Sequence, residues 1–452
     1  MEYDIVIIGA GVSGIFAAHE LAGTGQSILM IDKGKKLEER NCPLDRGQSC
    51  GCDACDKYVG FGGLGLSEGK YNYTNDFGGY LERKVGYRRA LQLMDEVDHL
   101  LCRYGGSQAE VYYTGDPDLV ERAKKAGFDV LTTKTRHLGT ELSRHVLQGM
   151  YNYLENRMDW RLETEVLKIY NRKNGGFRLV TSHCEIIETD KLIIATGRSG
   201  KEWFSRQCHF LGLKPGESRV DLGLRIEMRG NQLDSLLNRT FEIKLRFEGN
   251  DYSATTYCMN PHGRVVFKHQ EGLTMPDGQN YREQKESSKN LNFSLFIPSY
   301  FSSLEEADRY LREVVGGINR GIGRIAVQRL GDLRTGSVVY GPDQTSAIVP
   351  TLEADFADLR REVPELYIRA TLEFLEALET LLGEPIDGDT LLYAIDGKLY
   401  SPGVETNERF ETCIRHLYVI GDCSGTTHSL SQAAASGLYV GRALGRSGNS
   451  RN

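Results

Sequence analysis

Residues 4–14 read Asp-Ile-Val-Ile-Ile-Gly-Ala-Gly-Val-Ser-Gly and carry the strongest structural signal in the chain. The β-branched run at 4–8 predicts a short, buried, parallel strand. Three glycines follow in the spacing Gly-x-Gly-x-x-Gly, and residues 15–24 then predict a helix. A second predicted strand, at 27–31, ends at Asp32. A glycine-rich turn between a strand and a helix, with an acid after the next strand, is the fingerprint of a dinucleotide-binding unit.

Each glycine of this turn has its own role. Gly9 permits the tight turn after the strand, Gly11 lets a pyrophosphate approach the backbone, and Gly14 lets the helix pack closely against the strand. The helix amino terminus offers N–H groups and the positive end of its dipole to phosphates. Asp32 can accept hydrogen bonds from ribose hydroxyls. We therefore expect residues 4–32 to bind a dinucleotide, the alternative being a strand–helix–strand unit that binds nothing.

The composition excludes several classes of protein. Of the 452 residues, 40% are hydrophobic and 26% are charged, which is ordinary for a globular chain and unlike a disordered, collagen-like or coiled-coil protein. The net charge of −7 and the lack of a long basic run count against general nucleic-acid binding. The longest nearly apolar stretch, 5–18, is too short to span a bilayer, and no basic region precedes it as in a signal peptide. We therefore expect a cytoplasmic protein of two or three structural units, without a nucleic-acid or membrane partner.

Two further buried strands end in small-residue turns far along the chain. They read Lys-Leu-Ile-Ile-Ala-Thr-Gly at 191–197 and His-Leu-Tyr-Val-Ile-Gly-Asp at 416–422. Together with the fingerprint they resemble the FAD-dependent oxidoreductases of the glutathione-reductase-like FAD fold. The resemblance implies an α/β protein in which a discontinuous, Rossmann-type FAD domain carries an inserted, β-rich α+β substrate domain. The expected boundaries are 1–214 and 396–445 for the FAD domain, 215–395 for the inserted substrate domain, and 446–452 for a disordered tail.

A narrower resemblance covers most of the chain. It is to a family labelled uncharacterised FAD-dependent (NAD/FAD-utilising) dehydrogenases. The segments that carry it are the cysteine-rich loop at 40–58, the Gly-Gly-x-Gly-x-Ser-x-Gly-Lys run at 62–70, and the motifs at 221–227, 257–263 and 326–331. Residues 68–75 also look like the flavin-embracing loop of related flavoproteins, whereas 425–432 depart from the family pattern. The resemblance implies FAD and leaves the substrate open.

The resemblance also assigns contacts with FAD to particular residues. The three fingerprint glycines would meet the pyrophosphate, Asp32 the adenosine ribose, the backbone of Val166 the adenine, and Asp422 a ribityl hydroxyl. The helix that begins near Ser429 would direct its amino terminus at the N1/C2=O edge of the flavin, where its dipole would stabilise the anionic reduced ring. The other residues expected to contact FAD are Lys33, Arg40, Gly62, Gly63, Ser67, Lys70, Asn72, Thr196, Gly197, Gly421, Ser431, Gln432 and Ala433.

Four of the ten cysteines lie close together and admit three interpretations. Cys42, Cys50, Cys52 and Cys55 include C-x-C and C-x-x-C spacings, which suit a tetrahedral zinc ion or an iron–sulfur cluster. Alternatively, Cys50 and Cys55 have the C-x4-C spacing of flavin-linked disulfide reductases, although the residues around them do not match those enzymes. In the third interpretation the four are reduced cysteines with a packing role or none.

Several residues are candidates for proton transfer or substrate contact. Cys258 and His262 flank Met-Asn-Pro in a predicted turn after a strand, and Tyr400 is a possible acid. Histidine titrates near neutral pH and therefore suits the proton transfer that accompanies hydride transfer. The structural alternatives are a polar turn and a core tyrosine. Cys423 and His428, beside the turn expected to face the flavin, are further candidates for a substrate contact.

Together these features predict an FAD-dependent oxidoreductase that moves a hydride between flavin N5 and a small-molecule substrate. The expected reaction is dehydrogenation or reduction of a C–C or C–N bond. Residues 316–323 have the glycines of a second nucleotide turn but no strand before them, so NAD(P)H would bind transiently or another redox partner would exchange electrons. The alternatives are a dithiol–disulfide oxidoreductase acting through Cys50 and Cys55, a flavin-dependent RNA-modifying enzyme, and a non-catalytic flavoprotein.

Overall fold

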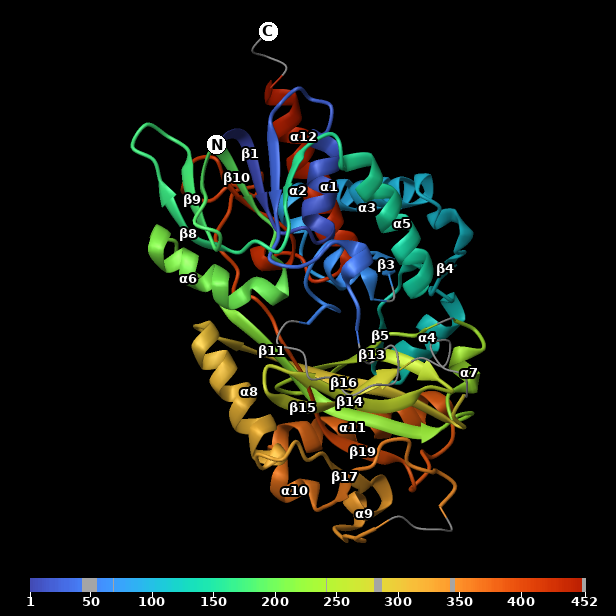
Figure 1. Ribbon diagram of the computed structural model, residues 1–452. Coiled ribbons are helices and arrows are strands. Elements are labelled where there is room, and N and C mark those ends of the chain that lie inside the picture. Colours follow the sequence, from blue (N-terminus) through green and yellow to red (C-terminus); the bar gives the residue numbers. More distant parts are fainter. Residues whose placement is uncertain (43–54, 68, 241, 280–286, 342–345, 449–452) are drawn as a thin grey trace. The chain divides into compact units, whose positions relative to one another are not determined.

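The computed structural model describes residues 1–42, 55–67, 69–240, 242–279, 287–341 and 346–448 (Figure 1). The chain forms two compact units. Unit 1 comprises Met1–Tyr112, Thr133–Ser218 and Tyr400–Asn452, and unit 2 comprises Tyr113–Thr132 and Arg219–Leu399. The first segment of unit 2 lies within the part of the sequence that was assigned to the FAD domain. The expected tail at 446–452 falls mostly outside the described residues, and the last helix extends to Gly448.

Unit 1 is built on a seven-stranded sheet. In order across the sheet its strands are β7 (Asp159–Arg161), β2 (Ile28–Ile31), β1 (Glu2–Ile8), β10 (Ile186–Ile194), β9 (Phe177–Thr181) and β8 (Val166–Asn171), and β20 (Leu417–Val419) also pairs with β10. The pairs among β7, β2, β1, β10 and β20 are parallel, whereas β9 and β8 run antiparallel. The α/β Rossmann-type architecture predicted from the sequence is confirmed.

The fingerprint strand β1 is buried on both faces of this sheet. Ile5 and Ile7 belong to one apolar core, and Val6 and Ile8 belong to another on the opposite face. The first core contains residues of the helices α1 (Val12–Leu21), α3 (Tyr87–Arg103), α5 (Gly139–Leu154) and α12 (Leu430–Gly448), and the second contains residues of α6 (Lys201–Leu211). A continuous β-branched run is therefore the pattern that this position requires.

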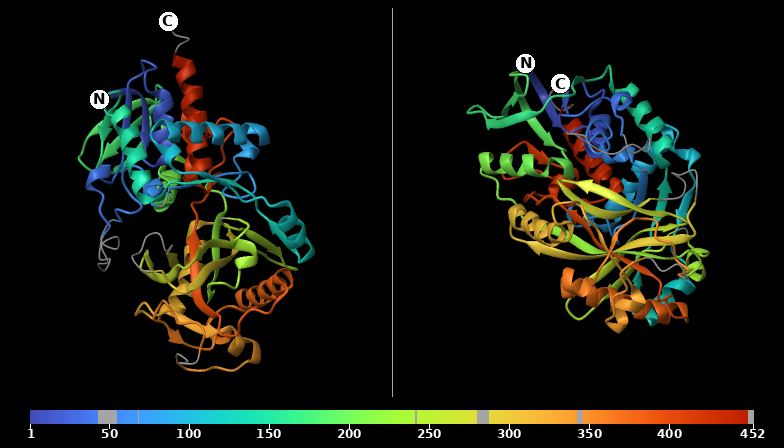
Figure 2. Two further views of the ribbon diagram at one scale, coloured as in Figure 1. Left: turned by 90° about the vertical axis from the view of Figure 1, so that its right-hand side faces the viewer. Right: turned by 60° about the horizontal axis from the view of Figure 1, so that its bottom comes forward.

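The helices α1 and α12 pack backbone against backbone, and Figure 2 shows the long α12 beside the sheet. A Cβ atom on Gly437 would lie 2.1 Å from the carbonyl oxygen of Ser13, and one on Gly441 would lie 2.5 Å from that of Ala17. Because these positions are one helical turn apart, both glycines lie on the face of α12 that contacts α1. This close approach holds the start of α12 next to the fingerprint turn.

Unit 1 also contains three further strands and one short helix. They are β3 (Lys70–Tyr73), β6 (Lys134–His137), β4 (Val111–Tyr113) and α2 (Glu82–Val85). The strands form a small sheet in the order β3–β6–β4. A buried ion pair between Arg136 and Asp98, with Nε and Oδ1 2.6 Å apart, ties this sheet to α3.

Unit 2 is built on an eight-stranded sheet. In order its strands are β18 (Asp355–Phe356), β17 (Ala326–Arg329), β19 (Leu391–Leu399), β11 (Ser218–Arg229), β16 (Asn290–Phe301), β13 (Ser253–Pro261), β12 (Leu245–Glu248) and β5 (Phe128–Val130). The other elements are the hairpin of β14 (Arg264–Gln270) and β15 (Leu273–Gln279) and the helices α4 (Pro117–Lys125), α7 (Asp234–Leu237), α8 (Leu304–Asn319), α9 (Leu330–Thr335), α10 (Leu359–Glu362) and α11 (Glu365–Leu382). This unit is therefore rich in β-structure.

The two faces of the unit 2 sheet differ in chemistry. Along β11, Leu222 and Leu224 point into the apolar core, whereas the side chains of Asp221 and Arg225 alternate with them and are also buried. The polar face contains hydrogen-bonded charges that sequence periodicity does not reveal. The strand β15 pairs with β14 along its whole length.

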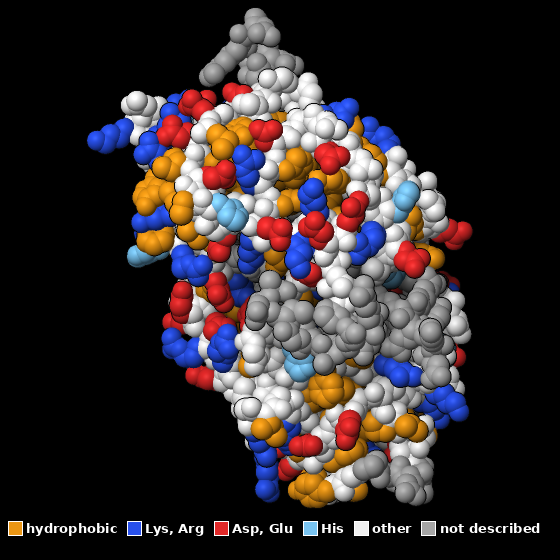
Figure 3. Space-filling view, in the orientation of Figure 1, with side chains coloured by type: hydrophobic (Ala, Val, Ile, Leu, Met, Phe, Trp, Pro, Cys, Tyr) orange, Lys and Arg blue, Asp and Glu red, His pale blue; other side chains and the backbone are white. Residues whose placement is uncertain are grey.

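Among the described residues, no helix combines the length and the apolar character needed to cross a membrane. On the face shown in Figure 3, acidic and basic side chains are interspersed over the surface. This mixture agrees with the modest net charge of −7.

Candidate functional site

The fingerprint turn joins β1 to α1, and its three glycines have different surroundings. A Cβ on Gly9 would lie 2.4 Å from the carbonyl oxygen of Ala195, and one on Gly14 would lie 2.0 Å from that of Gly9. A Cβ on Gly11 would meet no protein atom within 4 Å. Packing within the protein therefore requires Gly9 and Gly14. Gly11 instead borders open space at the uncapped amino terminus of α1, where a phosphate would bind.

A second glycine-rich loop lies against this turn. The amide of Gly62 donates to the carbonyl of Ala10 at 2.8 Å, and Gly62 and Gly11 form a β-bridge. The buried guanidinium of Arg40 donates to backbone carbonyls of the same loop, including that of Gly63 at 3.0 Å. Burial lowers the pKa of Arg40 to about 10, so it stays charged near neutral pH. The structure thus brings Arg40, Gly62 and Gly63 together beside the fingerprint turn.

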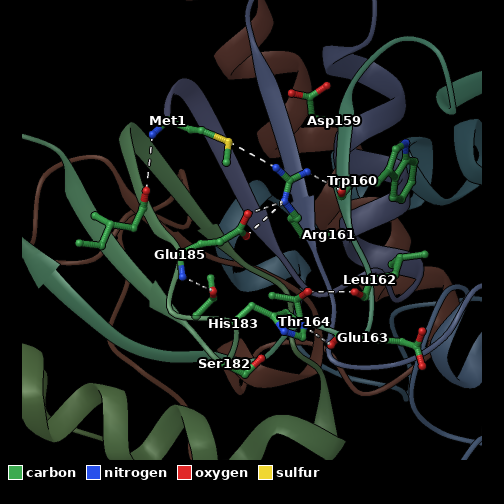
Figure 4. A network of polar contacts seen from close by, with 12 residues as sticks. Met1, Asp159, Trp160, Arg161, Leu162, Glu163, Thr164, Ser182, His183 and Glu185 are labelled. Atoms are coloured by element: carbon green, nitrogen blue, oxygen red, sulfur yellow. Dashed lines mark hydrogen bonds and ion pairs between the residues drawn. The ribbon is translucent and has the colours of Figure 1, made fainter.

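Asp32 follows β2 and faces the fingerprint turn. Its Oδ2 accepts from the amide of Ala10 at 2.8 Å, and its Oδ1 accepts from the amide of Gly34 at 2.7 Å. Each oxygen keeps accepting capacity for a ribose hydroxyl. Backbone hydrogen bonds with Arg161 and Thr164 hold Asp32 at the carboxyl end of β2. Arg161 in turn pairs with Glu185 at 3.2 Å (Figure 4).

Val166, predicted to hold the adenine, and Lys33, predicted to contact FAD, lie near this end of the sheet. Val166 is buried at the start of β8, and its carbonyl accepts from the indole Nε1 of Trp203 at 2.5 Å. A carbonyl oxygen has a second lone pair, so this bond leaves Val166 able to accept another donor. Lys33 follows Asp32 directly, and its side chain is exposed.

The turn after β20 contains a half-buried ion pair. Oδ2 of Asp422 lies 3.0 Å from Nε of Arg198, which comes from the turn after β10. Burial raises the pKa of Asp422 to about 6, although Arg198 opposes this shift. Gly421, before Asp422, has a φ of 69°, and a Cβ there would lie 2.4 Å from Oγ of Ser13. The two strand ends and the start of α1 therefore meet at this point.

A second helix, α12, begins in the site, as α1 does. Oγ of Ser429 accepts from the amide of Gln432 at 3.3 Å, and Ala433 continues the helix with a bond to the carbonyl of Ser429. The Gln432 amide group is bound to the loop after β3, donating to Thr74 and accepting from Leu81. The side chain of Ser431 is completely buried, yet its hydroxyl has no partner among the described residues.

The remaining predicted cofactor residues lie on β3 and at turns nearby. Lys70 and Asn72 are half-buried on one side of β3, and Oδ1 of Asn72 accepts from the hydroxyl of Thr135 at 2.8 Å. Ser67 ends the short helix that begins at Gly63. The predicted residues Thr196 and Gly197 lead from β10 into the turn that carries Arg198.

Aromatic side chains gather beside the Arg198–Asp422 pair. The rings of Tyr400 and His428 meet edge to face with centroids 4.9 Å apart, and the guanidinium of Arg198 lies 5.9 Å from the Tyr400 centroid. Tyr80 contacts His428 from the loop after β3, at 6.4 Å. Arg198 was not predicted from the sequence as a site residue. Its position directly after the Thr-Gly turn of a buried strand is the signal that could have predicted it.

The other predicted residues lie elsewhere. Cys258 and His262 are exposed in unit 2, both with positive φ, whereas Tyr400 belongs to unit 1. Their catalytic role stays a prediction. Cys42 and Cys55 are half-buried. Cys50 and Cys52 lie outside the described residues, so the metal and redox interpretations of the cysteine cluster also stay predictions.

Residues 4–39 match a family of FAD-binding domains, and these residues include the whole fingerprint from β1 to Asp32. The chain is an FAD-binding protein with a Rossmann-type FAD domain. Among curated proteins it is 21% identical over 459 residues to an uncharacterized protein of Clostridium beijerinckii, covering 96% of this chain and 79% of the relative. It is 29% identical over 110 residues to digeranylgeranylglycerophospholipid reductase 1 of Methanococcoides burtonii, covering 21% of this chain and 27% of that protein.

The similar solved structures are remote flavoenzymes. A quinol fumarate reductase of E. coli aligns with a TM-score of 0.43 and 14% identity, over 100% of this chain and 71% of the other. A mutant of the halogenase PltM in complex with FAD gives 0.42 and 11%, over 100% and 70%. The amino acid oxidase NikD gives 0.38 and 12%, over 98% and 94%.

The residues of this site fit FAD. Gly11 leaves space for a pyrophosphate, Asp32 has acceptor capacity for a ribose, and Asp422 can accept from a ribityl hydroxyl. The completely buried hydroxyl of Ser431 is one of the polar groups of this site that have no partner among the described residues, although buried polar atoms in folded proteins normally have one.

Replacing Ser431 with alanine is expected to weaken FAD binding about tenfold, close to the value of one hydrogen bond. The apoprotein should be as stable as the wild type, because the lost hydroxyl has no protein partner. Fluorescence titration with FAD and urea unfolding of the apoprotein measure the two effects. Ser436→Ala is the control, since its hydroxyl accepts from Gly421 and donates to Ala433. That variant should lose stability, and equal stability losses in both variants would contradict this account.

The raised pKa of Asp422 predicts that FAD affinity depends on pH. In the apoprotein the carboxylate is ionised only above its pKa of about 6. An ionised carboxylate accepts more strongly from a hydroxyl, so binding favours the deprotonated form and FAD affinity should fall as the pH drops below about 6. Asp422→Asn should bind FAD more weakly and lose this dependence. Titrations between about pH 5 and pH 8 test it, and an unchanged pH profile in the variant would rule out Asp422 as its source.

Proposed function

We propose that this protein is an FAD-dependent dehydrogenase or reductase that acts on a C–C or C–N bond of a small molecule. When bound, FAD supplies hydride transfer at N5, which is the cofactor's own chemistry. The observation that carries the proposal is the cluster of Tyr400, His428 and the Arg198–Asp422 pair, which meets the start of α12 within the FAD-binding unit. Hydride transfer to or from carbon needs a matching proton transfer, and this cluster contains groups that can perform it.

Each side chain of the cluster would have a separate role. Tyr400 is 5% exposed and is flanked by His428 on one side and Arg198 on the other, so its hydroxyl is held in one place. Tyr400 would hold or deliver the proton, with His428 as its neighbour for exchange. Arg198 would keep Asp422 in its ionised form, ready to accept from the cofactor's ribityl chain. His262 and Cys258 are the alternative proton carriers from unit 2.

Two observations bear on the class of reaction and on the source of electrons. The archaeal relative is named a reductase, which supports a redox reaction at carbon. In the described part of the chain, residues 316–319 are the end of α8, so the glycines at 316–323 do not follow a strand. NAD(P)H would therefore bind transiently, or a separate redox partner would exchange electrons with the flavin.

The test uses the purified holoenzyme without oxygen and a small-molecule extract of cells. If the extract contains a hydride donor, it should bleach the flavin absorption, and if it contains an acceptor, it should restore the absorption of pre-reduced enzyme. In D₂O, a reduced product should gain one deuterium from the flavin and one from solvent, which mass spectrometry detects. Flavin that is reoxidised only by O₂, with ¹⁸O from ¹⁸O₂ incorporated into the product, would instead make the protein a monooxygenase and overturn the proposal.

A further inference from the structure

Unit 2 contains a basic–aromatic patch that the proposed reaction does not use. We define this patch as Arg219 of β11, Lys244 just before β12, Tyr257 of β13, Phe296 of β16 and Lys398 of β19. These residues come from five separate stretches of chain and are brought together by the sheet order β19–β11–β16–β13–β12. All except Phe296 are half-buried, and Phe296 is buried.

Two lysine ammonium groups lie over one tyrosine ring in this patch. Nζ of Lys244 is 3.8 Å from the Tyr257 ring centroid, and Nζ of Lys398 is 4.3 Å from it. Lys398 also lies 4.6 Å from the centroid of Phe296, whose ring meets Tyr257 edge to face at 5.3 Å. Each contact is a favourable cation–π interaction on its own. Two like charges this close to one half-buried ring nevertheless repel each other.

A third cation reaches the same tyrosine. Arg219 forms a bidentate ion pair with the buried Asp221, at 2.5 Å and 2.9 Å, and its charge also acts on the Tyr257 hydroxyl, where it lowers the pKa. Arg219, Lys244 and Lys398 thus bring three positive charges to Tyr257, and the carboxylates of Asp221 and Asp277 lie near these cations. Burial, with the nearby Asp221, raises the pKa of Tyr257 above its ordinary value, so its hydroxyl stays protonated and remains a hydrogen-bond donor.

The residues next to the patch hold it rigidly. Tyr257 is paired in register with Ser294, whose hydroxyl donates to Oδ2 of Asp396 at 2.6 Å. Lys268 donates to Oδ1 of the same carboxylate at 2.6 Å, and Arg225 donates to Ser294 at 3.0 Å. This buried network lies on the same face of the sheet as the patch. A binding site gains precision when hydrogen bonds of this kind fix its floor.

We propose that the basic–aromatic patch binds the carboxylate or phosphate group of a small molecule whose body is flat and apolar. The anion would lie among the two ammonium groups and the guanidinium, where half-burial reduces screening by salt. The flat body would contact the rings of Tyr257 and Phe296. This inference goes beyond the proposed hydride transfer, and its test measures binding without turnover.

The test is calorimetric titration of the full-length holoenzyme with phenyl phosphate, benzoate and the neutral benzyl alcohol. Saturable binding of the anions, weakened by added salt, and no binding of the alcohol are expected. Whether phenyl phosphate or benzoate binds more tightly identifies the preferred anionic group. Lys244→Gln and Lys398→Gln should each weaken anion binding at least about tenfold, whereas Lys398→Arg should retain it. Lys124→Gln removes the same charge from an exposed position on α4 and should leave binding unchanged.

The FAD content of each variant is measured in parallel, so that loss of the cofactor is not mistaken for loss of the anion site. Normal FAD content with weakened anion binding supports the proposal. Absence of saturable anion binding by the wild type, or equal binding by the Lys244→Gln, Lys398→Gln double variant, would overturn it. Either of those results would leave the hydride-transfer proposal standing, because bleaching of the flavin by a cell extract is measured independently of these probes.

Discussion

Replacing Gly11 with valine is expected to give a folded protein that no longer retains FAD. No protein atom lies within 4 Å of a Cβ at this position, so the apoprotein can accommodate the side chain. The same space is where the pyrophosphate approaches the backbone and the start of α1. A valine there should weaken FAD binding by at least about 100-fold, or ~2.7 kcal/mol. FAD released by denaturation is counted per chain, and circular dichroism and thermal unfolding of the apoprotein check the fold.

Two other glycines make the controls. Gly14→Ala should destabilise the protein itself, because its Cβ would lie 2.0 Å from the carbonyl oxygen of Gly9. Gly317→Ala lies within α8, where a Cβ meets nothing within 4 Å, and it should keep FAD while gaining up to about 1 kcal/mol of stability. Full FAD content in Gly11→Val would mean that the cofactor does not approach this turn.

Replacing Arg198 with methionine is expected to reduce the free energy of unfolding by about 1–3 kcal/mol, because it removes the charged partner of the half-buried carboxylate of Asp422. The pKa of Asp422, already raised to about 6 by burial, should rise further, so the group takes up a proton near neutral pH. FAD affinity should fall with it. Urea unfolding of the apoprotein and FAD titration, both near neutral pH, measure the two losses.

The double variant Arg198→Met, Asp422→Asn distinguishes the stability lost through an unpaired charge from the stability lost through altered packing. Removing both charges should restore most of the stability that the single variant loses, since no uncompensated charge remains. Arg334→Met is the matched control, because Arg334 pairs with Glu379 at the surface at 2.9 Å, and such a pair contributes less than about 1 kcal/mol. If Arg198→Met is as stable as the wild type, the ion pair does not hold the site together.

The FAD-binding core was predictable because its signals are local. The fingerprint, its strand and its helix lie within residues 4–32, and each glycine can be interpreted from its immediate neighbours. The family match over 4–39 confirms this part of the prediction. The strands at 191–197 and 416–422 were predictable for the same reason, since a buried parallel strand is a continuous apolar run. Both are observed, as β10 and β20.

Features that depend on long-range packing could not be predicted. The pair of Arg198 and Asp422 joins two strand ends that only the sheet brings together. The segment 113–132 belongs to unit 2 because β5 pairs with the distant strand β12, with Val130 opposite Leu245. The strand β15 contains Pro276 and Gly278, residues that argue against a strand, and is held in place by its pairing with β14. The basic–aromatic patch could not be predicted either, because its five residues come from five separate stretches of chain that only the folded sheet brings together.

The central claim is that this chain binds FAD and uses it for redox chemistry at carbon. The most direct measurement is the visible spectrum of the full-length protein purified without oxygen, before and after an anaerobic small-molecule extract is added. We predict the oxidised-flavin bands near ~370 and ~450 nm, about one FAD per chain, and bleaching of these bands or recovery of pre-reduced flavin without O₂. A colourless protein that takes up no added FAD would contradict the account.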